Sequence, residues 1–138
     1  MDELDRSYPE ACAFFAGKPR ALGLYEAFVR RMLDTFPSTE LQVRKTQISL
    51  VDRRMYACVS LMRARRKVEL PPEYIVVTFS STGRLDSPRV AQQVEIHAGR
   101  WTIHVVVGDA SELDEELYGW VSASHACFVE GQGHPYGR

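Results

Sequence analysis

The spacing of apolar residues changes twice along this chain, and that change restricts the fold more than any other feature of the sequence. Apolar side chains recur every three or four residues between residues 20 and 36, which is typical of an amphipathic helix. From residue 41 to residue 107 they alternate in steps of two, which is typical of half-buried strands. Helical spacing returns at residues 113–128. Helices at both ends and consecutive strands between them predict an α+β fold with an antiparallel sheet.

Capping and turn residues set the predicted boundaries of the elements. Ser7 and Glu10 form a capping box for a short first helix that runs to about Phe15. Pro19 opens a second helix and Pro37 ends it. A third helix follows a cap at residue 109 or 111. About five strands are predicted, at residues 41–51, 55–63, 74–80, 93–97 and 101–107.

These elements are predicted to form a single α+β domain. The chain has 138 residues, of which 45% are hydrophobic and 25% charged, which suits one buried core and excludes a disordered chain or a coiled coil. The two N-terminal helices and the C-terminal helix are expected to pack mainly on one face of the sheet. We interpret residues 1–13 as an N-terminal extension with a short helix, residues 14–129 as the domain, and residues 130–138 as a flexible tail.

Nothing in the sequence predicts export, a membrane or a metal. No apolar run approaches the ~20 residues of a membrane span, and the acidic start of the chain is unlike a signal peptide. The cysteines Cys12, Cys58 and Cys127 are odd in number and include no C-x-x-C pair, which argues against disulfides and a zinc site. We therefore expect a cytoplasmic protein with no metal, cofactor or membrane partner.

Charge is distributed unevenly along the chain. The net charge is −1, yet residues 44–67 hold eight cations and one carboxylate, whereas residues 109–138 have a net charge of −5. A basic segment of this kind attracts an anionic partner. Alternatively, the basic hairpin and the acidic last helix lie together and neutralise one another.

Strand alternation predicts an apolar sheet face under the helices and a polar face opposite. The polar face collects Lys45, Gln47, Ser49, Tyr56, Tyr74, Thr78, Glu95, His97, Thr102 and His104. If this face is concave, it forms the floor of a pocket, and otherwise it is a solvated surface. Leu41 and Val43 share the phase of Lys45, so the first strand must bulge or bend near residue 44.

Five residues are predicted to bind an anionic ligand, either a phosphate-bearing small molecule or a nucleic acid: Lys45, Gln47, Ser49, Arg89 and His104. Lys45 and Arg89 would hold the charge, and Gln47 and Ser49 would orient the ligand. His104 would add a pH-sensitive contact. These residues favour a non-enzymatic binding module.

A small enzyme is one alternative. A hairpin that turns near residues 98–101 places Glu95 opposite His104 and His97 opposite Thr102. A carboxylate beside an imidazole can act as a general acid–base pair, although an ordinary cross-strand ion pair would use the same residues.

An interaction module is the other alternative. Arg63, Arg65 and Arg66 form a basic run at the end of a strand, where such residues often only solvate a sheet edge. They are also suited to nucleic-acid phosphates, with Tyr56, Tyr74 or Trp101 available for stacking on bases. In this reading, the polar face or the basic run contacts another protein or a second copy in a homodimer.

No motif names a reaction, because the sequence lacks a P-loop, G-x-S-x-G, G-x-G-x-x-G and H-E-x-x-H. Five segments carry a family resemblance instead: FFAGKP at 14–19, KTQIS at 45–49, SPR at 87–89, RWTIHVVV at 100–107 and LDEEL at 113–117. In this order they resemble a bacterial family known as domain of unknown function 5655, which is distantly similar to the YdhG-like group of small α+β domains.

The resemblance covers about residues 14–129. It implies an α+β domain that occurs alone or fused to other domains, some of them nuclease-like, which hints at nucleic acid. It supplies no established catalytic residue. The five predicted ligand residues fall on the most recognisable polar positions of the family.

Overall fold

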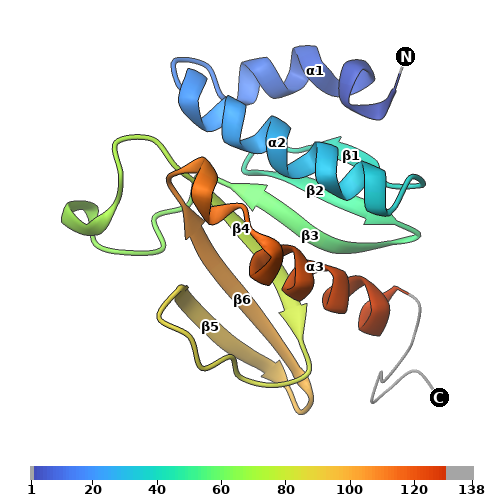
Figure 1. Cartoon of the computed structure of the whole chain (residues 1–138), viewed down its shortest axis with the longest axis vertical. Coiled ribbons are helices and arrows are strands. Elements are labelled where there is room, and N and C mark those ends of the chain that lie inside the picture. The colour runs from blue at the N-terminus through green and yellow to red at the C-terminus, as the bar shows by residue number, and fades with distance from the viewer. Residues whose placement is uncertain (1, 130–138) are drawn as a thin grey trace.

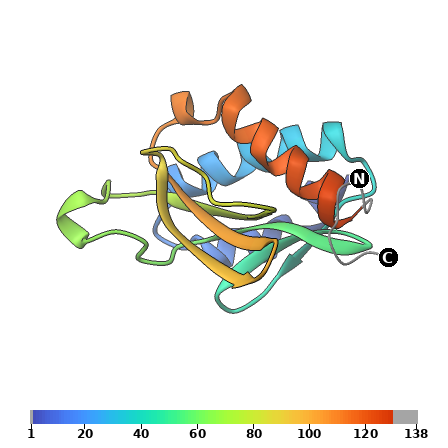
Figure 2. The ribbon, with the colours of Figure 1, turned by 90° about the horizontal axis from the view of Figure 1, so that it is seen from below.

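The computed structural model describes residues 2–129, and within them two helices lie on one face of an antiparallel sheet while a third packs beside its first strand (Figure 1; Figure 2). The helices are α1 (Glu3–Phe14), α2 (Pro19–Thr35) and α3 (Glu115–Phe128), and the strands are β1 (Glu40–Val43), β2 (Gln47–Asp52), β3 (Arg54–Ser60), β4 (Ile75–Ser81), β5 (Val90–His97) and β6 (Arg100–Val107), with two short 3-10 helices, η1 (Lys67–Glu69) and η2 (Ala110–Glu112). The strand order in the sheet is β1-β2-β3-β4-β6-β5. The predicted α+β class is therefore confirmed.

The core lies between α2, α3 and the sheet face that they cover. Tyr25, Phe28 and Met32 of α2 are fully buried against it. From the sheet, the fully buried side chains include Ile48, Leu50, Ile75, Val77, Ile103 and Val105. Because side chains alternate along a strand, the residues between them point to the opposite side, which we call the uncovered face.

The first helix begins earlier than the sequence predicts. Asp2 caps it, because its Oδ1 accepts a hydrogen bond from the Asp5 amide at 2.8 Å. Ser7, the predicted cap, is instead buried inside the helix and donates to the carbonyl of Glu3 at 3.0 Å. Leu4 of this helix is 2% exposed and belongs to the hydrophobic core. The predicted flexible tail, residues 130–138, lies outside the described residues.

The predicted strand at 41–51 is two strands, so residues 2–129 contain six strands rather than about five. The chain turns at residues 44–46, where the Arg44 amide donates to the Gln47 carbonyl at 2.8 Å. This hairpin pairs Leu41 with Leu50 and Val43 with Ile48, so all four side chains reach the same face. The phase conflict in the sequence is therefore resolved by a full turn rather than by a bulge.

The last hairpin has a different register from the predicted one. His97 pairs with Arg100, Glu95 with Trp101, and Gln92 with His104, because the turn is tight and the ladder shifts between Glu95 and His97. Gly99, with φ of 82°, provides the left-handed conformation that this turn needs. The predicted pairs of Glu95 with His104 and of His97 with Thr102 are wrong.

Candidate functional site

The uncovered face carries a row of small polar side chains. Strand pairing places Ser49, Cys58, Thr78 and His104 side by side across β2, β3, β4 and β6. Thr78 Oγ1 and His104 Nδ1 are hydrogen-bonded at 2.7 Å. Gln47 lies on the same face, and its Nε2 donates to Ser49 Oγ at 3.0 Å. Three of the five predicted ligand residues, Gln47, Ser49 and His104, therefore share this face.

This row is uncharged at neutral pH. Burial lowers the pKa of His104 below its usual value of 6.5, which favours the neutral imidazole. Burial raises the pKa of the Cys58 thiol, and a hydrogen bond from Thr78 only partly offsets this effect. The face can thus supply hydrogen bonds, while a charge must come from another residue.

Close to this row, α3 separates two strands of the sheet. Leu50 pairs with Ala57 and Val51 pairs with Met55, so Tyr56 is an extra residue in a β-bulge. Beyond it, the hydroxyl of Ser124 donates to the Tyr56 carbonyl at 2.8 Å and accepts from the Ser80 amide at 3.1 Å. Ser124 thus takes the place of a direct hydrogen bond between β3 and β4, and the two strands part at this level.

A depression of about 120 Å³, which we call the polar hollow, opens beside this separation. It is lined by Met55, Tyr56, Ala57, Cys58, Thr78, Phe79, Ser80, Arg100 and Thr102. Arg100 reaches across β4, where its Nη2 donates to Ser80 Oγ at 3.3 Å and its guanidinium carbon lies 4.6 Å from the ring centroid of Phe128. Among residues 2–129 no carboxylate forms an ion pair with Arg100. The guanidinium of Arg100 thus bonds the hydroxyl of Ser80, and Thr78 and Thr102 line the same hollow.

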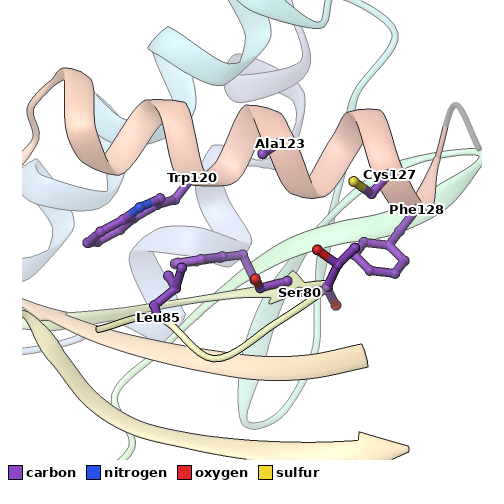
Figure 3. A pocket seen from close by; sticks show the side chains of 9 residues that line it. Ser80, Leu85, Trp120, Ala123, Cys127 and Phe128 are labelled. Carbon is purple, nitrogen blue, oxygen red and sulfur yellow. The ribbon is translucent and has the colours of Figure 1, made fainter. Parts of the chain in front are cut away.

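An apolar pocket of about 110 Å³ lies between α3 and the end of β4 (Figure 3). Trp120 and Leu85 stand at one end of it, and Phe128 stands at the other end beside Ser80, with Cys127 above (Figure 3). The pocket shares Phe79 and Ser80 with the polar hollow. Its apolar walls favour a small hydrocarbon group over an ion.

Lys45 and Arg89 do not join the other predicted ligand residues. Lys45 is exposed in the β1–β2 turn and lines a separate depression with Phe14 and Met62. Arg89 instead anchors the loop before β5 to the start of α3. Its Nη1 lies 2.8 Å from Asp114 and 3.0 Å from Glu116, and its Nη2 donates to the Glu112 carbonyl at 2.6 Å.

The other candidate residues are dispersed. Glu95 pairs with Trp101 and therefore points to the face opposite His104, so the proposed acid–base pair is not assembled. His97 lies at the end of β5. Arg63, Arg65 and Arg66 lie on the β3–β4 loop, which extends away from the sheet (Figure 1; Figure 2).

The basic segment and the acidic last helix do not neutralise each other as one interpretation expected. Glu115 pairs with Arg31 at 2.7 Å, while Asp114 and Glu116 pair with Arg89. None of these cations belongs to residues 44–67. Within residues 2–129, the ion pair between Arg66 and Glu69 is the only one that an Arg or Lys of that segment makes.

None of the three aromatic residues considered for base stacking presents an open ring on the uncovered face. Tyr56 is 2% exposed and packs among Phe36 and His125 on the helical side. Tyr74 is half-buried and donates to the Leu61 carbonyl at 3.1 Å. Trp101 packs against the hydrophobic core.

Sequence reasoning missed Arg100 and Ser124. An arginine beside a hairpin turn is normally solvated, and only the register of β6 against β4 brings Arg100 to Ser80. Ser124 had a visible signal, because it interrupts the apolar stripe of the last helix, where a serine needs a hydrogen-bond partner.

Comparison with known proteins gives one family. The family described as "Domain of unknown function (DUF5655)" matches residues 11–127. The curated proteins and the solved structures give no significant match. Within residues 2–129, no helix has the length and hydrophobicity to cross a membrane, and no three His, Cys, Asp or Glu side chains gather as metal ligands.

Proposed function

The chain belongs to the DUF5655 family, and because the description of that family names no activity, we propose a function from the geometry of the site: the domain binds a small phosphate-bearing ligand in the polar hollow. Arg100 holds the charge, and Ser80, Thr78 and Thr102 donate hydrogen bonds. The supporting observation is a half-buried guanidinium that has hydroxyl neighbours and no carboxylate partner within residues 2–129.

This assignment keeps the predicted class of ligand and changes the residues that carry the charge. Lys45 and Arg89 lie elsewhere, so Arg100 takes their role. Gln47 and Ser49 remain on the same face, at the side of the row far from His104. A charge-assisted hydrogen bond from a guanidinium is among the stronger contacts available to a phosphate, which is why one arginine suffices to define the site.

The size of the hollow favours a phosphate group over a longer polymer. Its volume of about 120 Å³ is roughly that of four water molecules. Single-stranded nucleic acid is bound mainly by stacking on exposed aromatic rings, which this face does not offer among the three candidates described above. A nucleoside monophosphate or a sugar phosphate would place its phosphate in the hollow and the remainder over the uncovered face.

His104 makes the binding depend on pH. It contacts the hollow through Thr78, whose hydroxyl is hydrogen-bonded to its Nδ1. In the Nε2–H tautomer that we propose for neutral His104, Nδ1 accepts from the Thr78 hydroxyl, and protonation of Nδ1 releases that hydroxyl to donate toward the ligand. Affinity therefore rises as the pH falls through the lowered pKa of His104.

We also propose that this domain is bacterial and cytoplasmic. Cys12, Cys58 and Cys127 are free thiols, and thiols remain reduced in that compartment.

Amide chemical shifts test the proposal. Inorganic phosphate and a nucleoside monophosphate, each titrated to about 10 mM at low salt, should shift the amides of Ser80, Arg100 and Thr102. Arg100→Gln should weaken binding about tenfold or more, because it removes the only charge in the hollow. Arg84→Gln, which removes an exposed charge from the nearby β4–β5 loop, is the matched control and should bind as the wild type does.

Lys45→Gln should also leave binding unchanged. If neither ligand shifts these amides, or if Arg100→Gln binds as tightly as the wild type, the assignment is wrong. A short oligonucleotide that binds much more tightly than phosphate, with shifts on residues 63–67, would move the function to the basic loop.

A further inference from the structure

The two edge strands of the sheet, β1 and β5, differ in how the rest of the fold contacts their backbones. β1 is short, and α1 packs beside it. Glu3 Oε2 accepts a hydrogen bond from the Leu41 amide at 2.7 Å, and Arg6 donates to the Leu41 carbonyl at 3.5 Å. Side chains of α1 thus occupy backbone groups that a further strand would need.

The backbone of the β5 edge has no such partner, although the side-chain amide of Gln93 donates to the Leu85 carbonyl and accepts from the Leu85 amide, each at 2.9 Å. β5 is eight residues long and pairs with β6 along one side only. Within residues 2–129, the backbone of Ala91–Ile96 bonds to β6 and to nothing else that the structure records. An open edge of this length presents unpaired N–H and C=O groups to any strand that approaches.

Two shifts in the β5–β6 ladder and the charge of Glu95 protect this edge in part, whereas the other side chains of β5 do not. The strand reads VAQQVEIH and contains no lysine, arginine or proline, the residues that most often prevent edge pairing. Val94 is 54% exposed and Ile96 is 57% exposed. They are two of the five large apolar side chains that are exposed among residues 2–129. The edge is thus both unpaired and apolar.

We propose that β5 pairs antiparallel with β5 of a second copy of this chain, around a two-fold axis at Val94. The two sheets of six strands would then become one continuous sheet. This surface is independent of the proposed binding function, since it uses the backbone of β5 and the side chains of Val94 and Ile96.

The charge pattern of β5 is compatible with this register. With Val94 opposite the partner's Val94, Gln93 lies opposite the partner's Glu95, and Ile96 lies opposite the partner's Gln92. No two like charges face each other. A shift of the axis by one residue to Glu95 would place two carboxylates directly opposite, which is unfavourable. The single carboxylate of β5 thus disfavours the register centred on Glu95 and leaves the one centred on Val94 free of like-charge contacts.

The small contact area between the two β5 strands predicts a weak affinity. One strand pair with two exposed apolar side chains from each copy is smaller than a standard interface, so we expect a dissociation constant on the order of 10–100 µM. Association of this strength is invisible at the low concentrations of a routine sizing column and becomes measurable at higher ones.

Sedimentation analysis over a concentration series tests the dimer. From about 5 µM to about 1 mM, the mass should rise from the 15.7 kDa of one chain toward twice that value. Val94→Lys should weaken association about tenfold or more, because it opposes two ammonium groups at the axis. Val68→Lys makes the same change at a position 85% exposed on the β3–β4 loop, and it should dimerise as the wild type does.

Amide hydrogen exchange of the unmodified chain gives a second readout that needs no variant. Amides within residues 91–96 should gain protection as the concentration rises, while the Leu41 amide, already bonded to Glu3, should not change. A mass that stays at 15.7 kDa throughout, or equal effects of the two lysine variants, overturns the proposal. So does a dimer whose protected amides lie on the uncovered face or the basic loop.

Discussion

Replacing Ser124 with alanine tests whether its hydroxyl holds β3 and β4 together. Ser124 is 1% exposed, donates to the Tyr56 carbonyl at 2.8 Å and accepts from the Ser80 amide at 3.1 Å. Ser124→Ala leaves two backbone groups without this partner in a region that water cannot easily enter. Each unsatisfied group costs about 1–3 kcal/mol, so we expect the free energy of unfolding to fall by about 2–4 kcal/mol.

Urea unfolding at neutral pH measures this loss. With a slope of about 2 kcal/mol per molar urea, typical of a chain of this size, the midpoint should fall by about 1–2 M. Ser122→Ala is the matched control, because Ser122 lies on the same helix, is half-buried and has no side-chain hydrogen bond among residues 2–129. Its midpoint should stay constant or rise slightly, since alanine is the better helix former.

The reasoning is refuted if the two serine variants differ by less than about 0.5 kcal/mol. Such a result would mean that β3 and β4 close up and that the Ser80 amide bonds the Tyr56 carbonyl directly. The polar hollow should then be altered as well, and the phosphate titration of Ser124→Ala would detect it.

Two further predictions concern His104 and the glycines. Burial lowers the pKa of His104 below 6.5 in the folded chain, so the unfolded chain binds a proton at His104 more readily. The contribution of neutral His104 to the free energy of unfolding is therefore complete above about pH 6.5 and is lost as the pH falls. In urea titrations between pH 7.5 and pH 5, the free energy of unfolding of the wild type should thus fall more than that of His104→Gln. Equal declines in the two proteins would contradict the burial of His104. Gly108→Ala would bring its Cβ into steric conflict with Pro71 Cγ, and thermal unfolding should show that the free energy of unfolding falls by about 1–3 kcal/mol. Gly23→Ala in α2 meets nothing within 4 Å and should gain about 0.5–1 kcal/mol, and a gain at both positions would mean that the Pro71 loop moves freely.

The sequence predicts elements whose stability is local and misses those set by distant partners. Apolar periodicity identifies α2 and α3, since each buries one face, although Ser124 interrupts the apolar stripe of α3. The start of α1 is missed, because both Asp2 and Ser7 suit a cap and only packing of Leu4 into the core decides between them. The β1–β2 turn at Arg44–Thr46 contains no glycine or proline, so only the phase conflict indicates it.

The candidate site depends more on register than on residue type. Gln47, Ser49 and His104 share a face because strand alternation is a local property. Glu95 lies on the face opposite His104 because the β5–β6 ladder shifts by one residue between Glu95 and His97, and the sequence does not reveal this shift. Arg89 looks like a free cation in the sequence, and its carboxylate partners on α3 become visible only in three dimensions.

The contact between α1 and β1 determines how many copies this sheet can join. Glu3 and Arg6 occupy backbone groups of β1, so the proposed strand pairing would end at two chains, because each chain would have a single open edge strand, β5. A chain that begins at Pro19 would have two open edge strands, β1 and β5, and further copies could then add to either edge without limit. If β5 pairs as proposed, α1 limits this pairing to two chains, and removal of α1 should lead to fibrous aggregates.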